Sequence, residues 1–110
     1  MNTQNKLTII QEIIKAKNID QKDIQLALSM LISSSLIQAL EITKPDNLEQ
    51  NLKLEDFDNE IQNIKSETDL ETFNSKINSL LSKDGTSFKD TFKSIFNNLL
   101  EKYIEELEKL

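Results

Sequence analysis

The stretch that decides the fold runs from Ile24 to Ile42 and reads IQLALSMLISSSLIQALEI. No charged residue occurs from position 24 through position 40, although charged residues make up 29% of the chain. Eleven of these seventeen positions are Ile, Leu, Met or Ala, and they are spread around the whole helical circumference. This pattern is typical of a buried central helix, so we expect the rest of the chain to pack around it.

Residues at its two ends define the length of this helix. Asp20 is the expected N-cap, with its carboxylate accepting a hydrogen bond from the backbone amide of Asp23. Pro45 is the expected stop, because proline disfavours helical geometry at Lys44. The sequence therefore predicts one helix over about 21–43.

Polar and small residues divide the surface of the predicted helix. One thin polar stripe is the edge expected to face water, and it consists of Gln25, Ser29 and Ser33. On the opposite side, a patch of small side chains would let another helix approach closely, either within the chain or from a second copy. The residues of this candidate interaction patch are Ala27, Ser34 and Ser35.

The rest of the chain carries apolar residues at helical spacing, and a single glycine and a single proline leave few turns. Helices are expected over 3–17, from about 54 to 65, from about 68 to Gly85, and over about 87–110. The helix that ends at Gly85 has two possible capping boxes at its start, one opened by Ser66 and one by Thr68. Whether residues 45–54 form a helix or a loop stays open.

The last predicted helix carries Phe92, Phe96, Leu99, Tyr103, Leu107 and Leu110 at an average spacing of 3.6 residues. A sustained coiled coil would need 3.5, so we expect burial within a bundle. Its final apolar residues are the second set of candidate interaction residues: Tyr103, Leu107 and Leu110. The chain as a whole is predicted to be all-α, a compact bundle of four to five helices around a central apolar helix at about 21–43, with a long C-terminal helix over about 87–110. A single domain covers 1–110.

The composition excludes several chemistries. The chain has no Cys and no His, so thiolate metal sites and the usual nucleophile–base pairs are absent. Asp56, Asp58 and Glu60 match the first positions of a calcium loop, but Ile61 replaces the glycine that such a loop requires. We therefore predict a non-enzymatic protein with no catalytic, cofactor-binding or metal-binding residues and no cofactor.

Charge and apolarity leave three functions open. The net charge of −6 and the absence of Arg disfavour direct binding to nucleic acid. The leading prediction is a helical interaction or assembly protein, self-associating into a homo-oligomer, because the apolar surface is large for so small a chain. The first alternative is a membrane-linked accessory protein of a phage or mobile element that uses 24–40, although seventeen uncharged residues are few for a bilayer span. The second is an acidic mimic of nucleic acid that inhibits a DNA- or RNA-binding partner through 55–71.

Source and location are predicted from simple features. Fourteen Ile, eleven Asn and thirteen Lys with no Arg are typical of an AT-rich genome. No signal peptide is recognised, because Glu12 and Lys15 interrupt the first apolar run, and there is no lipoprotein-type Cys. We expect a cytoplasmic protein.

Overall fold

The computed structural model describes residues 3–44, 48–82 and 87–110. These residues form five helices and no strand: α1 (Thr3–Lys17), α2 (Gln21–Thr43), α3 (Leu48–Lys65), α4 (Leu70–Ser82) and α5 (Ser87–Glu108). The predicted all-α class and the long C-terminal helix are confirmed. Pro45 and Gly85, which the sequence assigned to helix ends, lie outside the described residues.

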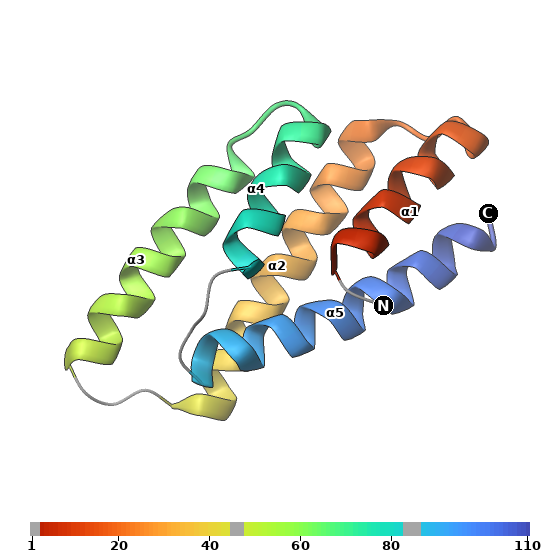
Figure 1. Ribbon diagram of the computed structural model, residues 1–110. Helices are drawn as coiled ribbons and strands as arrows, with labels where there is room; N and C mark the ends of the chain where they lie inside the picture. Colours follow the sequence, from red (N-terminus) through yellow and green to blue (C-terminus); the bar gives the residue numbers. More distant parts are fainter. Residues whose placement is uncertain (1–2, 45–47, 83–86) are drawn as a thin grey trace.

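The five helices form an elongated body of 47 × 24 × 20 Å. In Figure 1, α3, α4, α2 and α1 lie side by side, and α5 runs across α2 and α1. The most extensive helix–helix contact is between α2 and α5, and α5 also packs on α1. Helix α4 contacts α1, α2 and α3 and so connects α3 to the other helices.

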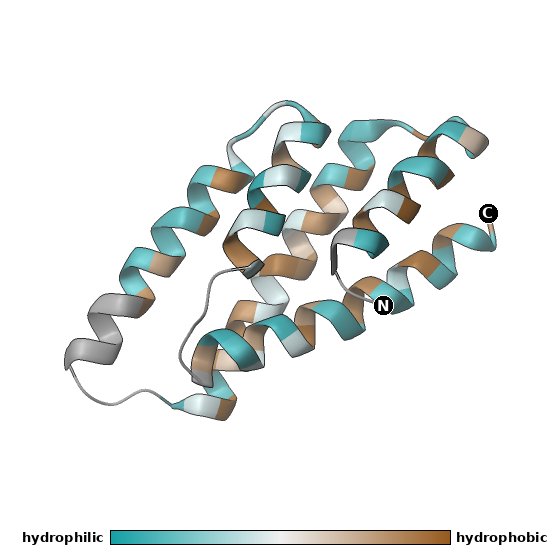
Figure 2. Ribbon diagram, viewed as in Figure 1, coloured by the Kyte–Doolittle hydropathy of each residue, from teal (hydrophilic) through white to brown (hydrophobic). Residues whose placement is uncertain are grey.

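Each helix contributes one apolar face to a single core. This core contains residues from all five helices, among them Ile10, Leu28, Ile61, Phe73 and Phe96, each with an exposed fraction of 0%. In Figure 2, the hydrophobic residues in the coloured part of α3 lie on the side turned towards α4, and the other side of that part is hydrophilic. The core follows the helical spacing of apolar residues in the sequence.

Two lysines of α1 bind backbone carbonyls of α5. The ammonium of Lys6 donates to the carbonyl of Asn97 at 3.1 Å and lies 3.8 Å from the carboxylate of Glu101. Lys17 donates to the carbonyl of Glu108, also at 3.1 Å, where the negative end of the helix dipole favours a cation. Because both pairs are separated by 91 positions, α1 and α5 run in the same direction.

Helix α2 has the predicted bounds, but its N-cap hydrogen bond differs from the prediction. The carboxylate of Asp20 accepts from the backbone amide of Lys22 at 2.9 Å and not from that of Asp23. An N-cap oxygen can reach either the second or the third amide of the helix, and in α2 it binds the second. At the other end, Lys44 is left-handed (φ 42°, ψ 59°) and donates its amide to the carbonyl of Leu40.

Of the region left open by the sequence, residues 48–54 belong to one continuous helix, because α3 begins at Leu48 and ends at Lys65, and residues 45–47 lie outside the described residues. Helix α4 is capped by Asp69, and neither Ser66 nor Thr68 is the residue next to its first turn. The Asp69 carboxylate accepts from the Thr72 backbone amide at 3.0 Å and from the Thr72 hydroxyl at 2.9 Å. Both predicted capping boxes were therefore wrong, since Asp69, which follows Ser66 and Thr68, caps the helix.

The hydrogen bonds from Thr72 lower the pKa of Asp69 below its ordinary value of 3.8. A lowered pKa in the folded state means that the carboxylate stabilises folding above about pH 4 and that this contribution is lost as the pH falls through the folded pKa. We expect Asp69→Asn, which keeps a capping oxygen, to be less stable than the wild type at pH 6 and equally stable near pH 2. Urea unfolding across this pH range measures the difference. A difference independent of pH would show that the charge has no role.

Candidate functional site

Helix α2 is buried on one face only, and the expectation of a helix covered on nearly every side is wrong. Its buried residues are Ile24, Leu28, Ile32, Ser35 and Ala39. The opposite face carries Leu26, Met30 and Ile37, which are 64%, 65% and 57% exposed. These three residues are four and seven positions apart, so they project from the same side of the helix. The predicted polar stripe is therefore not the only edge in contact with water.

The three exposed residues, Leu26, Met30 and Ile37, form what we call the outer face of α2. Three large apolar side chains, each more than half exposed, therefore follow one side of a single helix, and exposed apolar surface can mark an interaction site. Ile42 is also 65% exposed, but it lies on another side of the helix, sixteen positions after Leu26.

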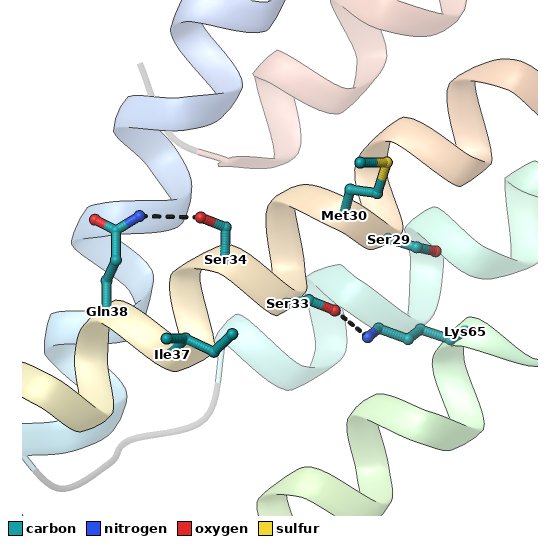
Figure 3. A pocket seen from close by; sticks show the side chains of 7 residues that line it. All are labelled: Ser29, Met30, Ser33, Ser34, Ile37, Gln38 and Lys65. Atoms are coloured by element: carbon teal, nitrogen blue, oxygen red, sulfur yellow. Dashed lines mark hydrogen bonds between the residues drawn. The ribbon is translucent and has the colours of Figure 1, made fainter.

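A shallow open groove of about 480 Å³ runs along the outer face beside the end of α3 (Figure 3). Lys65 reaches from α3 and donates a hydrogen bond to the hydroxyl of Ser33, and the Gln38 amide donates to the hydroxyl of Ser34 at 3.0 Å. The groove is thus lined by exposed apolar side chains and by two serine hydroxyls, of Ser33 and Ser34, that already have hydrogen-bond partners. The lining residues are Ser29, Met30, Ser33, Ser34, Ile37, Gln38 and Lys65.

The predicted small-residue patch on α2 does not form one exposed surface. Ser35 is completely buried, and its hydroxyl donates to the carbonyl of Leu31 at 2.7 Å. Ser34 is half-buried and borders the groove, and Ala27 is half-buried near the start of the helix. Of the three candidates, the structure brings only Ser34 to the outer face.

The candidate residues at the end of α5 have three different environments. Leu107 is buried in the core, Leu110 is 77% exposed, and Tyr103 is half-buried. Burial raises the pKa of the Tyr103 hydroxyl above its usual range, and the carboxylates of Glu106 and Asp23 add to this effect.

The acidic stretch at 55–71 is partly neutralised within the chain. Glu67 pairs with Lys76, and Asp69 is the α4 cap. Glu55, Asp56 and Glu60 are exposed on α3, whereas Asp58 is half-buried. Of the remaining exposed carboxylates of this stretch, three lie on α3, and Glu71 lies on α4.

Asn74 is a polar residue that the sequence reasoning missed, because it lies on an otherwise apolar face of α4. It is 4% exposed, and neither its amide nitrogen nor its amide oxygen has a hydrogen-bond partner among the residues that the structure describes. The sequence signal that could have identified it is a single asparagine at a position where the helical spacing of α4 otherwise places apolar residues. A buried amide without a partner costs stability.

Replacing this amide by a hydrocarbon of similar size removes that cost. We expect Asn74→Leu to raise the free energy of unfolding by about 1–3 kcal/mol, measured by urea denaturation. The matched control is Asn78→Leu, one turn later on α4 at a half-buried position, where little change is expected. A destabilised Asn74→Leu variant would contradict the assignment and show that the amide has a polar partner.

By length and composition, α2 is the one helix among the described residues that could cross a membrane. Only 22% of its most apolar eighteen-residue window is buried inside the molecule. Among the residues that the structure describes, no group of three acidic, histidine or cysteine side chains is placed to hold a metal ion.

Comparisons with known proteins give no relative for this chain. No family model, no curated protein and no solved structure matches it. The functional proposals below therefore depend on the outer face of α2 and on the charges around it.

Proposed function

We propose that this protein is a non-enzymatic, cytoplasmic assembly module that self-associates through the outer face of α2. The observation that supports it is the exposure of Leu26, Met30 and Ile37 on a helix whose other face is core. Covering these side chains removes apolar surface from water at about 25 cal/mol per Å², which favours association. A second copy supplies an identical apolar face and so covers both at once.

Sedimentation or light scattering at micromolar concentration tests this proposal. The expected mass is twice the chain mass of 12.7 kDa. We expect Met30→Asp/Ile37→Asp to have the mass of one chain, because two carboxylates on each face oppose association. The control is Leu110→Asp, which places the same charge at the exposed end of the chain, and it should keep the doubled mass. A wild-type mass of one chain, or loss of association only in the Leu110 variant, would refute the proposed surface.

A membrane-linked accessory role is the second candidate, and the length and limited burial of α2 favour it. In this case the outer face would lie against lipid. Flotation with neutral phosphatidylcholine vesicles tests it, because such vesicles do not repel a chain of net charge −6. Recovery of the protein in the lipid-free fraction would count against this candidate.

The acidic surface of α3 supports the third candidate, an inhibitor that imitates nucleic acid. Glu55, Asp56 and Glu60 are its exposed carboxylates. Binding to a basic DNA-binding protein should weaken as salt rises and should be lost when Asp56, Asp58 and Glu60 are neutralised. Binding that persists in the neutralised variant would rule this role out.

A further inference from the structure

We propose that the second copy packs antiparallel to the first across the outer face of α2, with the two-fold axis between Ser33 and Ser34. This inference rests on the proposed function and specifies its interface. It follows from how the apolar residues and charges of α2 are distributed about this point.

The apolar side chains are balanced about the proposed axis. Met30 and Ile37 are equally distant from the midpoint of Ser33 and Ser34 along the chain. In an antiparallel pair, Met30 of one copy therefore lies level with Ile37 of the other. The serines between them are half-buried and accept hydrogen bonds from Gln38 and Lys65, so the centre of this contact is polar and its apolar contacts lie on either side, at Met30 and Ile37.

The groove gives the incoming side chains a place to pack. Its lining includes Met30, Ser33, Ser34 and Ile37, the four positions nearest the axis on this face. Across the axis, Met30 of the second copy comes level with Ile37, which lines the groove. The groove is shallow and open, which suits a side chain from another helix.

Charges at the two ends of α2 select the orientation. Asp23 at the start and Lys44 at the end are both exposed, and both are equally distant from the proposed axis. An antiparallel pair sets Asp23 level with Lys44 of the other copy, whereas a parallel pair sets like charges level with each other. The helix dipoles also oppose in the antiparallel pair, which favours it.

Leu26 and Glu41 are also equally distant from the proposed axis, so they form a further pair between the two copies. Glu41 is exposed, and its methylene groups can cover Leu26 of the other copy while its carboxylate stays in water. In the antiparallel pair these two positions are level. Two copies of Leu26 are then fifteen positions apart, which is about 22 Å along a helix.

Cysteine cross-linking tests the orientation, because the chain contains no cysteine of its own. The variants Leu26→Cys and Glu41→Cys are oxidised separately and as an equimolar mixture. A disulfide needs Cα atoms within about 7 Å, so we expect cross-linked dimer in the mixture and little in either variant alone. Glu101→Cys, on the exposed surface of α5, replaces Glu41→Cys in the control mixture and should give none.

The outcomes separate this inference from the proposed function. The mass of each variant under reducing conditions establishes whether it still associates. A doubled mass with efficient cross-linking of Leu26→Cys alone would overturn the antiparallel arrangement in favour of a parallel one. A doubled mass with no cross-link in the mixture would also overturn it. A mass of one chain for the wild type would refute the proposed function itself, whereas a mass of one chain for Leu26→Cys alone would show that Leu26 is needed for association and would call for the same cross-linking at another pair of level positions.

Discussion

We expect Leu28→Asp to abolish the cooperative thermal transition of this chain. The Leu28 side chain is completely buried on the inner face of α2, where the helix packs on α5 and α4. Removing a buried leucine costs about 2–5 kcal/mol, and a buried carboxylate without a partner adds several more. A domain of this size is stable by only about 5–15 kcal/mol. Far-UV circular dichroism during heating measures the loss of the transition.

Met30→Asp is the matched control, two positions further along the same helix. Met30 is 65% exposed, so the same charge is introduced on the outer face without burial. We expect its stability to stay within about 0.5 kcal/mol of the wild type at the lowest usable protein concentration. If the two variants melted alike, the division of α2 into an inner and an outer face would be incorrect.

The ends of α2 were predictable because they are encoded locally. Asp20 supplies a capping carboxylate, and Pro45 disfavours a helical residue before it, so both bounds follow from the residues at the boundary. The α4 cap was harder, because Ser66, Thr68 and Asp69 are all capable N-caps within four positions. Which of the three residues caps the helix depends on how the first turn of α4 packs against the rest of the protein.

The buried side of α2 was not predictable from the sequence. Apolar residues occur around its whole circumference, so Leu26 and Leu28 have the same character although one is exposed and the other is in the core. In α4 and α5 the apolar residues are concentrated on one side, and there the spacing identified core residues such as Phe73 and Phe92. Part of the apolar excess in α2 is therefore not used by its own fold, and self-association is the use that we propose for it.

Phe92→Ala is the second substitution with a large expected effect. Phe92 is 1% exposed and joins two helices, because its ring meets Phe57 of α3 edge-on at 5.1 Å and stacks on Phe96 at 6.1 Å. Phe57 also meets Phe88 edge-on at 5.5 Å, so this aromatic cluster holds α3 against α5. The Lys89 ammonium lies 5.6 Å from the centre of the Phe57 ring and adds a cation–π contact.

Truncation of Phe92 removes its ring from the centre of this cluster and leaves a cavity. We expect a loss of about 3–5 kcal/mol, and because each kcal/mol corresponds to roughly 4–8 °C in a domain of this length, the Tm should fall by at least about 12 °C. Phe92→Leu is the control, since it keeps most of the apolar volume and should cost clearly less. Calorimetry at one protein concentration measures all three chains. Equal Tm values for Phe92→Ala and the wild type would show that α3 is held by contacts other than the aromatic cluster.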